Sequence, residues 1–108
     1  AITSFDDARC AKVRAALERH GVHLALHTLS AVNVAEYSPY VGDGVEAYLR
    51  SYVDISPKLG AQWIVVHAGY HFGSDKAMRM AAGKERLARV CAHAEKKEAV
   101  ILLENLNK

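Results

Sequence analysis

Hydrophobic residues along the chain follow two patterns, a spacing of three or four positions and short continuous runs. The first pattern predicts amphipathic helices, and it covers residues 6–20, 45–59 and 74–97. The second predicts strands, and its runs lie at 22–27, 63–67 and 99–104. The predicted order is therefore a helix followed by a strand, three times over.

Residues at the edges of these segments are typical of helix ends. Asp6 suits a helix start, and Gly21 and Gly60 stand where two of the helices should stop. Pro57 should kink the second helix or end it early, because proline removes a backbone hydrogen bond. The polar stretch from 28 to about 44 is expected to be a loop.

Strands that alternate with helices predict an α/β fold with a parallel sheet and right-handed connections. The strands should end at 27, 67 and 104, at intervals of 40 and 37 residues. A complete (β/α)8 barrel needs about 250 residues. We therefore expect residues 1–108 to be a fragment, roughly the first half of a TIM barrel with about three parallel strands. A small open sheet that needs a partner surface is the alternative.

Composition argues against several classes of protein, such as membrane and secreted proteins, but does not indicate a function. The 14 basic and 12 acidic residues give a net charge of +2, too balanced to predict nucleic-acid binding. No apolar run approaches the ~18 residues of a membrane helix, and the first residues do not resemble a secretory signal. Cys10 and Cys91 lie far apart, and we expect both to be reduced and buried in a cytoplasmic protein.

Each predicted strand ends in a residue that can bind a metal or move a proton: His27, His67 and Glu104. Parallel α/β folds build their active sites at this carboxyl edge of the sheet. Two imidazoles and a carboxylate suit a divalent metal such as zinc, manganese or iron. Glu104 is the most informative, because an unpaired carboxylate is costly to bury after the apolar run before it.

Simpler roles remain open for these residues. Either histidine could be an ordinary strand-end residue bonded to the backbone. Asn33 and His71 lie in loops on the same edge and could bind substrate, support a ligand or simply stabilise a loop. Asn107, just beyond Glu104, could bind a hydroxyl-rich ligand or cap loop backbone.

The chain resembles the xylose-isomerase-like TIM-barrel superfamily. That superfamily contains sugar and sugar-phosphate isomerases and epimerases and endonuclease IV, the family 2 apurinic/apyrimidinic endonuclease. The matching segments are His27 with Asn33-Val34-Ala35, Leu59-Gly60-Ala61, Val65-Val66-His67-Ala68-Gly69-Tyr70-His71, and Leu103-Glu104-Asn105-Leu106-Asn107. By this resemblance the three strands are the second, third and fourth of the barrel.

The resemblance implies two activities. In endonuclease IV, histidines on the second and third strands and a glutamate on the fourth bind zinc, and His27, His67 and Glu104 match them. Glu104-Asn105-Leu106-Asn107 is instead similar to the isomerases and epimerases, in which this glutamate binds a divalent metal and moves the proton. Their second carboxylate, with an aspartate and a histidine ligand, comes from later strands.

Our sequence hypothesis is a metal-dependent sugar or sugar-phosphate isomerase or epimerase. Glu104 would be the catalytic residue and a ligand of Mn, Mg, Co or Zn together with His67 and His27. His71, Asn33 and Asn107 would bind the sugar. The alternatives are a zinc-dependent endonuclease and a non-catalytic barrel relative. If 108 residues are the whole product, exposed sheet edges predict a homo-oligomer.

Overall fold

The structure, a computed structural model, describes residues 4–105 as three helices that alternate with three strands. The helices are α1 (Asp7–His20), α2 (Pro39–Leu59) and α3 (Lys76–Lys96). The strands are β1 (Leu26–His27), β2 (Ile64–His67) and β3 (Ile101–Glu104). The predicted order of elements and the three predicted strand ends are confirmed.

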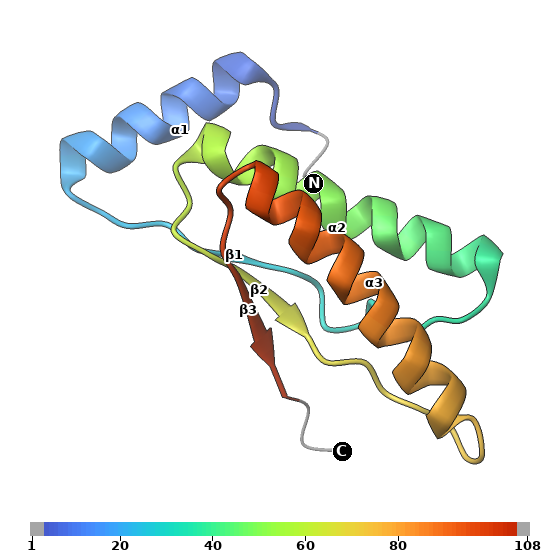
Figure 1. Ribbon diagram of the computed structural model, residues 1–108. Helices are drawn as coiled ribbons and strands as arrows, with labels where there is room; N and C mark the ends of the chain where they lie inside the picture. Colours follow the sequence, from blue (N-terminus) through green and yellow to red (C-terminus); the bar gives the residue numbers. More distant parts are fainter. Residues whose placement is uncertain (1–3, 106–108) are drawn as a thin grey trace.

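The three strands form one parallel sheet in the order β1-β2-β3. His27 is paired with Val65, and His67 with Glu104. Figure 1 shows the helices gathered on one side of the sheet, with α3 next to α2 and α1 on the far side of α2. All three strands therefore run in one direction, and their carboxyl ends share one edge.

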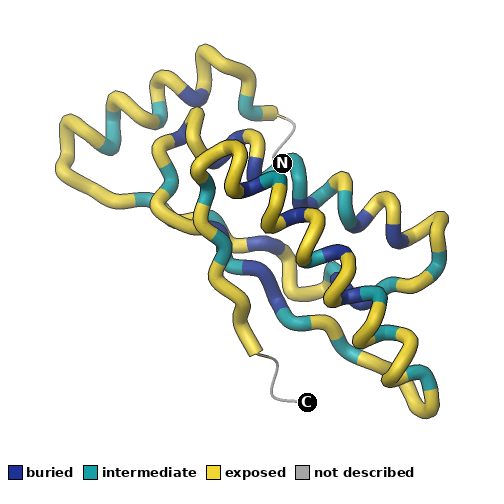
Figure 2. Tube along the Cα trace, in the orientation of Figure 1, coloured by how far each residue is buried: buried dark blue, intermediate teal, exposed yellow. Residues whose placement is uncertain are grey.

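The core lies between the sheet and the helices α2 and α3. Ile64 and Val66 of β2 are 1% and 2% exposed, because alternate side chains of a strand point to the same face and this face is covered. Figure 2 shows that buried positions lie along β2 and recur along α2 and α3. The main cluster consists of Val34, Val45, Leu49, Val53, Ile64, Val66, Val90 and Ala94.

Helix ends follow the predicted signals. The Asp6 carboxylate accepts a hydrogen bond from the Arg9 backbone N–H at 2.8 Å and so caps α1. Gly21 and Gly60 end α1 and α2 with φ of 62° and 70°, a left-handed conformation that glycine adopts without strain.

Helix α2 is longer than predicted, since it begins at Pro39 rather than at 45. Proline is favourable in a first helical turn, where its missing N–H has no partner to lose. Residue 42, in this first turn, is a glycine. A Cβ at this position would clash with Nη2 of Arg86. Pro57 does not end α2 early, because the helix continues to Leu59.

Two further expectations are corrected. Strand β1 covers only Leu26–His27 instead of 22–27, although the Leu24 carbonyl still accepts a hydrogen bond from the Gln62 N–H at 2.8 Å. Cys10 is buried as predicted, whereas Cys91 is exposed because it lies on the outer side of α3. Within residues 4–105, no helix is both long and apolar enough to cross a membrane.

Candidate metal centre and adjoining groove

The three predicted ligand residues come together at the carboxyl edge of the sheet. Nε2 of His67 lies 3.2 Å from Oε2 of Glu104, and Nε2 of His27 lies 3.5 Å from the same oxygen. The two imidazole rings meet edge to face, with their centroids 4.8 Å apart. One potential ligand atom from each of the three residues lies within 4.8 Å of the others.

The strand register explains this convergence. His27 pairs with Val65, and Val65 and His67 are two positions apart, so their side chains point to the same face of the sheet. Glu104 pairs directly with His67 and shares that face. It is the face opposite to the one that Ile64 presents to the helices. Parallel pairing of three strands that each end in a donor residue therefore builds the cluster.

Burial differs among the three side chains. The His67 side chain is 5% exposed, whereas those of His27 and Glu104 are 61% and 52% exposed. His67 is thus fixed within the sheet, and the other two border on the open space above it. A small molecule can reach Glu104.

Hydrogen bonds to Thr28 define which ring nitrogens carry protons. Nδ1 of His27 lies 2.9 Å from the Thr28 carbonyl oxygen, which can only accept, so this Nδ1 is protonated. The Thr28 hydroxyl donates to the Val65 carbonyl at 2.9 Å. Its oxygen can then only accept from Nδ1 of His67, which lies 3.4 Å away.

When the two imidazoles are neutral, each therefore turns an unprotonated Nε2 toward the same carboxylate oxygen of Glu104. Lone pairs on three acceptors repel one another unless a positive charge lies between them. Two imidazole nitrogens and a carboxylate oxygen form a donor set that divalent transition metals accept. The chemistry of these residues thus fits a divalent metal ion.

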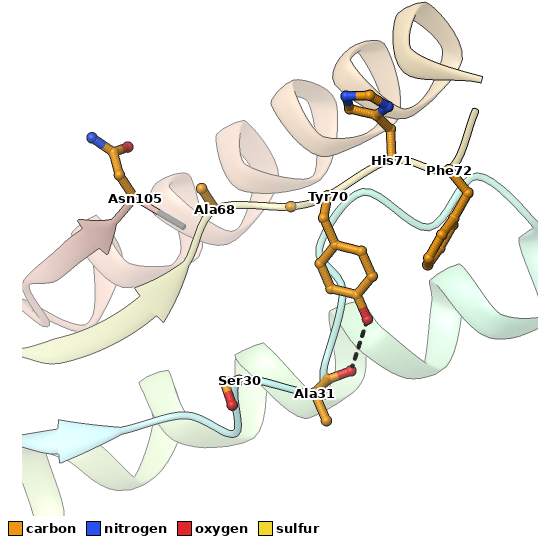
Figure 3. Close-up of a pocket in the computed structure, with 8 residues that line it drawn as sticks. Ser30, Ala31, Ala68, Tyr70, His71, Phe72 and Asn105 are labelled. Carbon is orange, nitrogen blue, oxygen red and sulfur yellow. Dashed lines mark hydrogen bonds between the residues drawn. The ribbon is translucent and has the colours of Figure 1, made fainter. Parts of the chain in front are cut away.

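A groove of about 1010 Å³ adjoins the cluster. It begins at Ala68 and Asn105, which directly follow His67 and Glu104 in sequence. This volume is at the upper end of the range for small-molecule sites. The lining residues, drawn in Figure 3, are Ser30, Ala31, Ala68, Gly69, Tyr70, His71, Phe72 and Asn105.

The loop after β2 divides its side chains between two directions (Figure 3). Tyr70 points toward the β1–α2 loop and donates a hydrogen bond to the Ala31 carbonyl at 3.5 Å. Phe72 lies on the same side, edge to face with the Tyr70 ring. His71 points the other way and is exposed in the groove, so it is placed to meet a ligand there.

Asn33 is 4% exposed and holds two loops together. Its Oδ1 accepts from the backbone N–H groups of Ala35 and Tyr70 at 3.0 and 3.1 Å. Its Nδ2 donates to the Tyr70 carbonyl at 3.0 Å. The structure thus places Asn33 behind the groove rather than in its lining, and Asn107 lies outside the described residues.

Arg79 was not singled out by sequence reasoning, yet it joins the same two loops. Its guanidinium contacts Asp75 at 2.6 Å and Glu36 at 3.2 Å, and it lies 5.0 Å from the ring centres of both Tyr37 and Phe72. The hydrogen bond from Arg79 lowers the pKa of Asp75. The four-residue spacing of Asp75 and Arg79 on a helix was the available signal.

Thr28 was also missed. The signal was its position: a hydroxyl residue directly follows the last residue of an apolar strand that ends in a candidate ligand. Such neighbours often orient metal-binding histidines through the nitrogen that faces away from the metal.

A family model described as "Xylose isomerase-like TIM barrel" matches residues 1–108. The chain belongs to this family. Its fold is accordingly α/β and part of a TIM barrel, as the sequence predicted. Comparison with curated proteins gives no match.

Solved structures share this fold. The chain superimposes on a D-tagatose 3-epimerase-like protein with a TM-score of 0.84 at 20% identity, covering 95% of this chain and 40% of that one. A D-psicose 3-epimerase studied with D-fructose gives 0.84 at 21% identity, with 99% and 40% coverage. A proposed sugar phosphate isomerase/epimerase from Anabaena variabilis gives 0.68 at 18%, with 90% and 36% coverage. The chain therefore spans about two fifths of the length of these proteins.

Proposed function

We propose that the complete protein is a divalent-metal-dependent isomerase or epimerase of a sugar or sugar phosphate. In this proposal His27, His67 and Glu104 hold the metal, whose identity among Mn, Mg, Co and Zn stays open. The observation that carries the proposal is the convergence of two histidine Nε2 atoms on one Glu104 oxygen beside a groove. The family and the epimerase structures that share its fold support the choice of a sugar substrate.

Glu104 would move the proton. Its side chain is 52% exposed and borders an open hollow together with His27, so it can reach both a metal and a carbon-bound proton of the substrate. The chemistry that a bound divalent cation supplies is polarisation of the carbonyl and hydroxyl oxygens of an open-chain sugar, which acidifies the neighbouring C–H. Return of the proton to the adjacent carbon gives an isomer.

Epimerisation needs a second proton donor on the opposite face of the substrate. The family resemblance implies a carboxylate on a later barrel strand for this role, outside these 108 residues. Within them, His71 would bind a sugar hydroxyl from the groove. Asn33 would act through the Tyr70 loop that it holds, and Asn107 would contact the sugar near Glu104.

Proton exchange with solvent tests this proposal most directly. The complete natural protein with Mn²⁺ is incubated with D-fructose or D-psicose in D₂O, and deuterium on the sugar is followed by NMR. We expect Glu104→Gln to slow exchange by about 10²-fold or more. Glu95→Gln, on the exposed surface of α3, is the matched control and should leave the rate unchanged. Unchanged exchange in Glu104→Gln would rule out its catalytic role.

A second candidate function rests on the same three residues. The resemblance to endonuclease IV assigns zinc to a histidine, a histidine and a glutamate on consecutive strands, and the three side chains do converge here. This reading predicts salt-sensitive binding to DNA and cleavage at an abasic site with Zn²⁺. Cleavage without sugar exchange would favour the endonuclease.

We also propose that residues 1–108 form about the first half of one barrel domain. The intact mass of the natural product tests this, because a complete barrel of about 250 residues weighs about 30 kDa. A natural product of 11.8 kDa would contradict it and would instead predict a homo-oligomer that pairs half barrels, measurable by light scattering.

A further inference from the structure

Thr28 makes the second contact of both candidate ligand histidines. Its carbonyl oxygen meets Nδ1 of His27 at 2.9 Å, and its hydroxyl oxygen meets Nδ1 of His67 at 3.4 Å. One residue therefore bonds to imidazoles from two different strands. It does so from their far sides, away from Glu104.

Thr28 is itself fixed in place. It is 3% exposed, and both its backbone N–H and its hydroxyl donate to the Val65 carbonyl, at 3.0 and 2.9 Å. These two bonds tie the residue after β1 to the middle of β2. Because the hydroxyl proton is used in this way, the Thr28 oxygen presents only lone pairs to His67.

The two contacts have the same consequence for both rings. Each Nδ1 lies beside a Thr28 oxygen that can accept a hydrogen bond from it, and a neutral ring that keeps its proton there leaves Nε2 bare. Both bare nitrogens face Oε2 of Glu104. Without these contacts an imidazole could place its proton on Nε2, where it would block a metal ion.

We infer that Thr28 is a positioning residue that holds His27 and His67 in the Nδ1-protonated form and so prepares both Nε2 atoms as ligands. The statement about metal rests on the proposed function, whereas the statement about the protons does not. The two contacts use different atoms of Thr28, since the carbonyl serves His27 and the hydroxyl serves His67. A side-chain substitution should therefore affect one histidine and spare the other.

The test substitutes Thr28→Val, which keeps the shape and the carbonyl but removes the hydroxyl, and Thr28→Ser, which restores the hydroxyl. Nitrogen NMR of the histidine rings in the complete natural protein, without metal and at a pH where the rings are neutral, reports which nitrogen carries the proton. We expect His67 to lose its Nδ1 preference in Thr28→Val and to regain it in Thr28→Ser. His27 is the internal control and should be unchanged in both variants.

Metal affinity supplies a second readout. Calorimetry with Mn²⁺ and with Zn²⁺ should show about 10- to 100-fold weaker binding for Thr28→Val, the usual effect of losing such a supporting contact, and near-normal binding for Thr28→Ser. An Nδ1-protonated His67 in a folded Thr28→Val variant would overturn the inference. Natural protein that binds neither ion but shows the expected proton positions would overturn the proposed metal site instead, while supporting the role of Thr28 in tautomer choice.

Discussion

Val66 and His67 are neighbours in β2 and equally inaccessible, at 2% and 4% exposure, but they face opposite sides of the sheet. Val66 packs into the cluster formed with α2 and α3. His67 has hydrogen-bonding and electrostatic partners instead, in Thr28 and Glu104. The helix side gains stability in proportion to the apolar area removed from water, at about 25 cal/mol per Å². On the His67 side, the ability to bind a metal depends instead on which ring nitrogens carry protons.

This contrast predicts that the two faces can be altered separately. The largest effect on stability is expected for Leu49→Ala on the helix side, since Leu49 is 2% exposed in the main cluster. Loss of a buried leucine side chain should lower the free energy of unfolding by about 2–5 kcal/mol. Urea unfolding of the complete natural protein measures this loss.

The matched control is Val41→Ala on the same helix, where Val41 is 54% exposed and the change should stay within about 0.5 kcal/mol. The number of Mn²⁺ ions bound per folded Leu49→Ala chain should remain that of the unaltered protein. A folded variant that loses metal binding would show that the two faces are coupled.

An intermediate effect is expected at Gly69, on the side of the groove. A Cβ there would lie 2.4 Å from Cβ of Ala35 and 3.0 Å from Oδ1 of Asn33. Gly69→Ala should therefore push the two loops apart and lower the free energy of unfolding by about 1–3 kcal/mol. It should also raise the KM for a sugar substrate, because His71 belongs to the displaced loop.

Gly44→Ala is the control for this substitution. Gly44 lies within α2 with no atom within 4 Å of a Cβ, so alanine there should stabilise the helix by about 0.4–1 kcal/mol. Equal stability of the two variants would contradict the close packing at Gly69.

The candidate ligands could be predicted from sequence because strand ends and parallel pairing fix their positions. His67 and Glu104 end their strands in register, and His27 lies beside Val65, two positions earlier on the same face, so the three residues meet without any knowledge of side-chain packing. The role of Asn33 could not be predicted, because its partners at Tyr70 are 37 positions away and are backbone groups.

Boundaries were less predictable for a related reason. The start of α2 contains Gly42 and Gly44, which favour a loop when the segment is considered alone. Tertiary contact overrides that preference at Gly42, where Arg86 occupies the space of a side chain. Cys91 follows the buried Val90, and only the rotation of α3 against the sheet decides which of the two faces inward.

The smallest effect at neutral pH is expected from a polar contact on the helix side. The Tyr48 hydroxyl accepts from the Leu29 N–H at 3.1 Å and donates to the Tyr52 hydroxyl at 3.2 Å. Burial, first, and the adjacent Tyr48, second, raise the pKa of Tyr52 to about 12. The raised pKa means that the folded state favours protonated Tyr52. Its contribution is therefore fully present below the unfolded pKa near 10 and is lost as the pH rises through about 12.

Tyr48→Phe should lower the pKa of Tyr52 but leave it above 10, because burial is the larger cause and persists. Tyrosinate absorbance measured against pH follows this change, and Tyr40→Phe, at a 92% exposed position, removes one hydroxyl without affecting Tyr52. An unaltered Tyr52 titration in Tyr48→Phe would show that burial alone sets its pKa. The Tyr48 hydroxyl also holds the backbone of Leu29, which directly follows Thr28. Nitrogen NMR of His67 in Tyr48→Phe therefore tests whether a change among the helices alters the protonation of a candidate ligand on the opposite face of the sheet. An unchanged His67 tautomer would support the conclusion that the two faces of the sheet are independent, whereas a changed tautomer would show that they are coupled.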